Sequence, residues 1–160
     1  MSISVGDKIP REQLTVMREH GPAPIHSDEL LGDGLTVLFA VPGAFTPTCS
    51  AEHLPSFIEN AQALRNKGVE RVVCMAVNDI FVMDAWARQN DVGSAVTMAA
   101  DGNGNFTRAL GLELDASAFG MGYRCQRFAM IIRDGTVEHV FVEGPGEYRV
   151  SSATYVLDQI

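Results

Sequence analysis

The sequence predicts an α/β fold in which helices cover both faces of a mixed sheet. Two continuous apolar runs, LTVLFAV at 35–41 and RVVCMAV at 71–77, are typical of strands buried on both faces. Each run precedes a segment expected to be helical, and such alternation implies right-handed crossovers between parallel strands. Near the C-terminus, an Asp-Gly pair between two apolar segments predicts an antiparallel hairpin. Together these observations predict a three-layer domain.

The first half of the chain holds two short extended pieces, a buried strand and a long helix. The extended pieces, near 14–18 and 23–26, flank the turn Gly21-Pro22. The strand is the run 35–41. A helix is then expected from about Pro47 to Lys67, because apolar residues recur there at helical spacing, and Gly68 ends it.

The second half repeats the strand–helix pattern and closes with the hairpin. After the strand at 71–77, the predicted elements are a helix at 79–89, a strand at 95–100, a short helix at 105–110, hairpin strands at 128–133 and 137–142, and a C-terminal helix at 151–160. Ser151 or Ser152 is the expected cap of the last helix.

Composition limits the class of protein and its partners. A length of 160 residues fits one domain spanning 1–160, and 46% hydrophobic with 20% charged residues excludes a disordered chain. A net charge of -8 disfavours nucleic acid as a partner. No apolar run approaches the roughly 18–20 residues of a membrane helix, and the N-terminus lacks a signal peptide. Three cysteines make no disulfide framework, so we expect a reduced, cytoplasmic protein.

The segment PGAFTPTC at 42–49 carries the chemistry, because it joins a buried strand to a helix. Thr46 is expected to be the N-cap and Pro47 the first helical residue, which places Cys49 in the first turn. Unsatisfied N–H groups and the helix dipole there favour a nucleophilic thiolate. The alternative is that these residues only begin a helix and that Cys49 is a buried, unreactive side chain. Pro55 should kink or loosen the helix.

The same segment resembles the active-site motif of the peroxiredoxins. Pro42, Thr46 and Cys49 match Pro-x-x-x-Thr-x-x-Cys, and PGAFTPTCS followed by HLP is similar to the type II, or peroxiredoxin-five, subfamily. Further matches follow in the order of the family: VNDIFVMDAW at 77–86, DGNGNFTRALGL at 101–112 and RCQRFAMIIRDGTV at 124–137. Several long blocks in register are specific evidence of family membership.

The resemblance implies a thioredoxin-like fold and a thiol-dependent peroxidase without metal or organic cofactor. Hydrogen peroxide and organic hydroperoxides would oxidise Cys49, the peroxidatic cysteine, to sulfenic acid. Thr46 would position the peroxide, Pro42 would shield the thiolate from water, and Arg127 would stabilise the thiolate and the transition state. The family also implies a homodimer, whose face or active-site entrance could include Phe45, Phe119 and Met121.

The cysteines predict how the sulfenic acid is reduced. Animal members of the subfamily carry a resolving cysteine at a place that falls here near 149–151, where none occurs. Cys74 lies within an apolar run and is expected to be buried, although some plant relatives are discussed as using a cysteine there. We therefore expect a one-cysteine cycle with an external reductant: glutathione with glutaredoxin, thioredoxin or another thiol.

Two arginines compete for the site. If the segment around them is extended, Arg124 and Arg127 point to opposite faces, and Cys125 shares the face of Arg127. The family match and this alternation assign Arg127 to the site and Arg124 to a supporting or interface role.

Three other readings of the sequence compete with the peroxidase. His53 follows Cys49 by one helical turn, as in a cysteine hydrolase, but no orienting acid or oxyanion segment accompanies it. The loop at 101–105 has residues typical of a calcium-binding loop, but its sequence departs from the calcium-loop pattern. This departure favours a simple turn. Finally, oxidation of Cys49 could serve only as a signal, in a peroxide-sensing regulator or binding protein.

Overall fold

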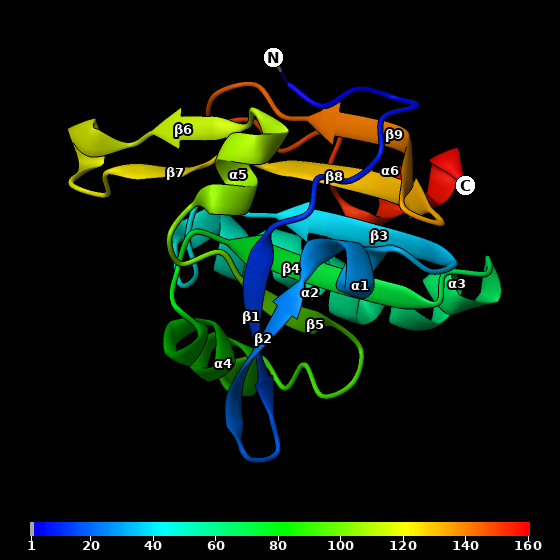
Figure 1. Cartoon of the computed structure of the whole chain (residues 1–160), viewed down its shortest axis with the longest axis horizontal. Coiled ribbons are helices and arrows are strands. Elements are labelled where there is room, and N and C mark those ends of the chain that lie inside the picture. The colour runs from blue at the N-terminus through cyan, green and yellow to red at the C-terminus, as the bar shows by residue number, and fades with distance from the viewer. Residues whose placement is uncertain (1) are drawn as a thin grey trace.

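A seven-stranded sheet forms the centre of the computed structural model, which describes residues 2–160 (Figure 1). The strand order is β2-β1-β5-β4-β3-β8-β9. The strands are β1 (Gln13–Arg18), β2 (Gly21–His26), β3 (Leu35–Ala40), β4 (Arg71–Ala76), β5 (Thr97–Ala100), β8 (Phe128–Arg133) and β9 (Thr136–Val142). Strands β3, β4 and β5 are parallel, and the pairs β3–β8, β8–β9, β1–β5 and β1–β2 are antiparallel. The predicted mixed sheet is therefore confirmed.

Helices cover both faces of this sheet. They are α1 (Ser27–Leu31), α2 (Leu54–Glu59), α3 (Ala61–Asn66), α4 (Ile80–Gln89), α5 (Asn105–Leu110) and α6 (Ala153–Gln159). Because side chains alternate along β3, Val37 and Phe39 join the cluster formed with α2, α3, α4 and α6, whereas Leu38 joins the cluster formed with α1 and α5. The continuous apolar run at 35–41 arises from this burial on both faces, and the three-layer prediction is confirmed.

The prediction of one continuous helix from Pro47 to Lys67 is wrong. Helical backbone begins at Pro47 as expected, but Cys49–His53 forms a π-helical turn (η1), and Asn60 separates α2 from α3. Pro55 explains the wide turn, since it has no N–H for the Ala51 carbonyl and its ring crowds that carbonyl. Instead, the Leu54 N–H donates to the Cys49 carbonyl.

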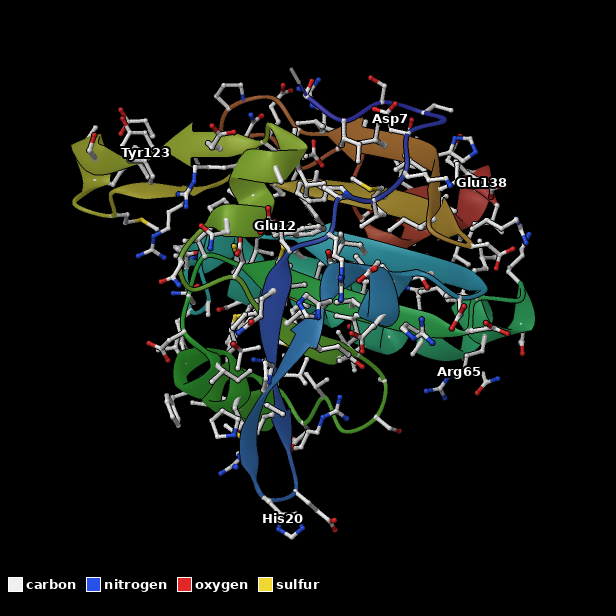
Figure 2. All side chains as sticks on the ribbon, in the orientation of Figure 1. Asp7, Glu12, His20, Arg65, Tyr123 and Glu138 are labelled. Atoms are coloured by element: carbon white, nitrogen blue, oxygen red, sulfur yellow. The ribbon has the colours of Figure 1, made fainter. Side chains whose placement is uncertain are left out.

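Two features are absent from the sequence prediction. One is the short helix α1. The other is a two-stranded sheet of β6 (Glu113–Asp115) and β7 (Tyr123–Cys125), with the 3₁₀ turn η2 (Ser117–Phe119) between the strands. These residues form an arm that projects from the sheet and carries Tyr123 on its surface (Figures 1 and 2). Strands of three residues are too short for a periodicity argument.

The structure also bears on membrane insertion. Within residues 2–160, none of the helices has the length and apolar character needed to cross a membrane.

Candidate active site

The loop after β3 brings the site together at the carboxyl end of the parallel strands. The Val41 N–H donates to the Met75 carbonyl at 3.1 Å, and the Ala44 N–H donates to Asn78 Oδ1 at 2.9 Å. Phe45 adopts a left-handed backbone with φ 67°, a conformation that costs free energy for a residue with a side chain. The chain turns there and enters the helix at Pro47.

Cys49 is buried, and the Thr46 hydroxyl lies against its sulfur. Thr46 Oγ1 is 2.9 Å from Cys49 Sγ and 2.6 Å from the Gly43 carbonyl. A hydroxyl has one proton to donate, so it bonds either the carbonyl or a thiolate at Cys49. Thr46 occupies the predicted N-cap position before Pro47, but its side chain does not bond the backbone N–H groups of the first turn. Its oxygen faces the sulfur instead, and only its carbonyl bonds the helix, accepting from the Ser50 N–H at 2.9 Å.

Arg127 supplies the second group on the sulfur. It lies in the link between β7 and β8, and its Nη2 donates to Cys49 Sγ at 3.1 Å. Arg124 is directed elsewhere, with its Nε donating to the Met121 carbonyl at 2.9 Å and its Nη1 near Gly43. Residues 126 and 127 are outside the strands, so strict alternation does not apply to them. A positive guanidinium at this distance favours the ionised sulfur.

His53 holds the other side of the guanidinium. Its Nδ1 is 2.8 Å from Arg127 Nη1, and its Nε2 is 2.8 Å from the Ser151 carbonyl. The ring is buried among Phe39, Phe57 and Tyr148. Burial, and then the Arg127 charge, lower the pKa of His53 to about 3, against partial compensation by Ser151 and Glu143. His53 is therefore neutral at physiological pH.

This arrangement disfavours a cysteine hydrolase. Both nitrogens of His53 are bonded to groups other than Cys49. A base with a pKa of about 3 holds a proton too weakly to activate a thiol near neutral pH. The sequence identifies His53 as a neighbour of Cys49, but its contact with Arg127 joins residues 74 positions apart and has no local signal.

Pro42 lies at the rim of a pocket beside the guanidinium. The pocket has a volume of about 340 Å³, and Thr48, Phe119 and Arg127 also line it. Phe119 is largely exposed on the arm, and Phe45 is partly exposed on the active-site loop. Cys49 has no exposed surface, and the pocket is open space that its partner Arg127 lines.

The other two cysteines are buried within the fold. Cys74 lies in β4, where burial raises its pKa well above the usual value. Cys125 ends β7, lies 3.0 Å from the Val41 carbonyl and has a pKa raised to about 12, mainly by burial. All three cysteines are free. Neither Cys74 nor Cys125 is therefore ionised near neutral pH.

The loop at 101–105 forms the turn that the sequence favours over a calcium site. The Asp101 carboxylate accepts hydrogen bonds from the N–H groups of Phe106 and Thr107 and from the Thr107 hydroxyl. It therefore fixes the start of α5. Across residues 2–160, no group of three or more His, Cys, Asp or Glu side chains is placed to hold a metal ion.

Comparisons with known proteins show which family the chain resembles along nearly its whole length. The family model described as Redoxin matches residues 4–157. Peroxiredoxin-2B from Arabidopsis thaliana is 44% identical over 158 residues, which cover 97% of this chain and 96% of the relative.

Solved structures extend the similarity to the whole fold. Reduced Prx3 from Vibrio vulnificus, in complex with hydrogen peroxide, has a TM-score of 0.94 and 43% identity, covering 98% of each chain. Peroxiredoxin 5 from Alvinella pompejana has a TM-score of 0.84 and 34% identity, covering 97% of this chain and 96% of that one. The fold is thus thioredoxin-like, with a mixed central sheet. The chain belongs to the peroxiredoxin family.

Proposed function

We propose that this peroxiredoxin is a thiol-dependent peroxidase whose peroxidatic residue is Cys49. The observation that carries the proposal is the convergence of two donors on one sulfur, with Thr46 Oγ1 at 2.9 Å and Arg127 Nη2 at 3.1 Å. Both donors stabilise a thiolate, which is the nucleophilic form of cysteine. Its relatives are peroxiredoxins, and one of them, Prx3 from Vibrio vulnificus, binds hydrogen peroxide.

The reaction transfers one oxygen atom to sulfur. The Cys49 thiolate attacks the terminal oxygen of ROOH, a sulfur–oxygen bond forms, and the oxygen–oxygen bond breaks. The RO⁻ leaving group takes the electron pair and then a proton, which gives ROH and Cys49 sulfenic acid. In this step cysteine is oxidised by two electrons and the peroxide is reduced.

Each neighbour of the sulfur has a distinct part in that step. Arg127 offers fixed N–H donors and a permanent charge where negative charge moves from sulfur to oxygen. The Thr46 hydroxyl donates to the thiolate or to the incoming peroxide. Pro42, at the rim of the pocket, limits water around the sulfur. Peroxide approaches from this pocket, on the side of Thr48 and Arg127.

The sulfenic acid is reduced by an external thiol. One thiol RSH condenses with Cys49 sulfenic acid to give a mixed disulfide and water, and a second RSH releases the Cys49 thiol and RSSR. The burial of Cys74 and Cys125 and their raised pKa values oppose an internal disulfide. Residues 149–151, where the place of the resolving cysteine of animal members falls, contain no cysteine. Glutathione with glutaredoxin is the proposed reductant, and thioredoxin is the alternative.

A homodimer in the cytoplasm completes the proposal. Large apolar side chains are exposed on the active-site loop, at the start of α4 and on the arm, and a second copy would cover them. They are Phe45, Phe81, Phe119 and Tyr123. Three free thiols suit a reducing compartment. Sedimentation at micromolar concentration should give twice the 17.3 kDa of one chain.

The decisive experiment measures peroxide consumption with each reductant. Wild type and Cys49→Ser are compared with glutathione plus glutaredoxin and with thioredoxin plus its reductase. Catalytic turnover by wild type alone supports the peroxidase. Oxidation once per chain without turnover in either system would instead favour a peroxide sensor.

A further inference from the structure

Glu143, the residue that follows β9, is a buried carboxylate that makes no contact with the sulfur. It is 6% exposed. Its oxygens accept hydrogen bonds from three consecutive backbone N–H groups, those of Arg149, Val150 and Ser151, at 2.8 to 2.9 Å, and from Ser151 Oγ at 2.6 Å. Its own N–H donates to the Arg127 carbonyl at 2.9 Å. Glu143 therefore fixes both the loop at 149–151 and the backbone that carries Arg127.

Hydrogen bonds, rather than a cation, stabilise this buried charge. None of the ion pairs found among residues 2–160 involves Glu143. Burial acts to raise the pKa of Glu143, but the bonds from Ser151 and the two preceding amides outweigh it and lower the pKa below the usual value. The carboxylate stays ionised at neutral pH and holds the loop through charge-assisted bonds.

The ordered loop determines the orientation of His53. The Ser151 carbonyl can only accept a hydrogen bond, so His53 Nε2 must carry the proton of the neutral ring. His53 Nδ1 is then left with a lone pair, and a guanidinium can only donate. Arg127 Nη1 is thus held at 2.8 Å by an acceptor, and the planar guanidinium directs Nη2 toward Cys49 Sγ.

We infer that Glu143 is a positioning residue for the peroxidase reaction, acting on Arg127 through Ser151 and His53. The inference rests on the proposed function and goes beyond it, because the Glu143 carboxylate, which also lines the pocket, bonds the loop at 149–151 rather than the sulfur. Without the carboxylate, the loop at 149–151 loses the acceptor for three amides. The Ser151 carbonyl then no longer fixes His53, and Arg127 gains freedom to turn away from Cys49.

The test is Glu143→Gln, measured as the second-order rate constant of the reduced protein with hydrogen peroxide. We expect a fall of about tenfold, since loss of an outer partner that orients a functional side chain costs roughly 10- to 100-fold in metal sites. The thiolate absorbance near neutral pH should fall in parallel. Glu138→Gln is the matched control, because Glu138 lies on β9, the strand that leads to Glu143, is partly exposed (Figure 2), and pairs with Arg133. It should react at the wild-type rate.

A double-mutant cycle separates positioning from general destabilisation. If Glu143 acts through Arg127, Glu143→Gln should have almost no further effect in an Arg127→Ala background. An equal loss in both backgrounds, or a folded Glu143→Gln protein with the wild-type rate, would overturn the inference. An inactive wild type would refute the proposed function itself.

Should Glu143→Gln fail to fold by circular dichroism, Ser151→Ala replaces it in the same cycle. This variant removes one bond to Glu143 but keeps the backbone carbonyl. We expect a roughly two- to threefold lower rate, a smaller loss than Glu143→Gln gives, because the three backbone amides keep their carboxylate acceptor. The loss should again be confined to the background that retains Arg127. A Ser151→Ala protein with an unchanged rate, or with the same loss in the Arg127→Ala background, would overturn the inference.

Discussion

Acidification should destabilise this protein through the buried, neutral side chain of His53. Between its usual pKa of 6.5 and its folded value of about 3, the unfolded chain binds a proton at His53 that the folded protein does not. The contribution of neutral His53 to folding stability is therefore present above about pH 6.5 and is lost as the pH falls toward 3. At about pH 5 the free energy of unfolding is lower than at neutral pH by roughly 2 kcal/mol from this group.

The physical reason is that the surroundings of His53 in the folded protein disfavour a positive charge on the imidazole. Protonation at Nδ1 would put a positive donor against Arg127 Nη1, which is 2.8 Å away and can only donate. The ring has no solvent to stabilise the charge, since it is buried against Phe39 and Phe57. The pKa of Glu143 is below its usual 4.5 in the folded protein, so its contribution to stability is lost mainly below about pH 4.5, where His53 has already lost most of its own.

The assay compares wild type with His53→Gln by urea unfolding at about pH 7 and about pH 5, under reducing conditions. Between these pH values, the free energy of unfolding of wild type should fall by roughly 2 kcal/mol more than that of the variant. His20, His26 and His139 are present in both proteins, so their contributions cancel in the comparison. Equal losses in the two proteins would refute the reasoning, because a buried neutral histidine must oppose folding when it is charged.

Three further outcomes follow from the contacts at the sulfur. Arg127→Lys should retain the fold but react with peroxide at least about tenfold more slowly by stopped flow, because lysine lacks the planar pair of donors that bridges His53 and Cys49; an unchanged rate would exclude this role. Thr46→Val should lower the rate constant about a hundredfold, the cost of one transition-state donor, while Thr46→Ser restores most of it; equal rates for the two variants would contradict this. After one equivalent of peroxide without thiol, mass spectrometry should find Cys49 sulfenic acid that dimedone traps, and a dominant intramolecular disulfide would overturn the one-cysteine cycle.

Local patterns were sufficient to predict the sheet and the helix start. The runs at 35–41 and 71–77 are apolar at every position because both faces of β3 and β4 are covered, and Pro47 begins the helix because its ring suits a first turn. Pro55 indicated a disturbed helix. The form of the disturbance, a π turn that includes Cys49, depends on which carbonyl the Leu54 N–H reaches.

The parts of the site that come from distant segments were harder to predict. The family match and strand alternation both point to Arg127, but residues 126 and 127 lie outside the strands, and the contact of Arg127 with Cys49 spans 78 positions. Helical spacing places His53 beside Cys49, but its hydrogen-bond partners are Arg127 and Ser151. Glu143 carries no motif. Its burial results from a loop that folds back onto it, and hydrophobic periodicity says nothing about such a contact.

The central claim is that Cys49 is the one sulfur that peroxide oxidises, and a single-turnover measurement tests it most directly. Reduced wild type and Cys49→Ser, each with Cys74 and Cys125 intact, are mixed with one equivalent of hydrogen peroxide, and peroxide loss and the site of oxidation are followed together. The account predicts that wild type consumes one peroxide per chain with oxidation at Cys49, and that Cys49→Ser consumes almost none. Rapid peroxide loss in Cys49→Ser, or oxidation of wild type mainly at Cys74 or Cys125, would contradict it.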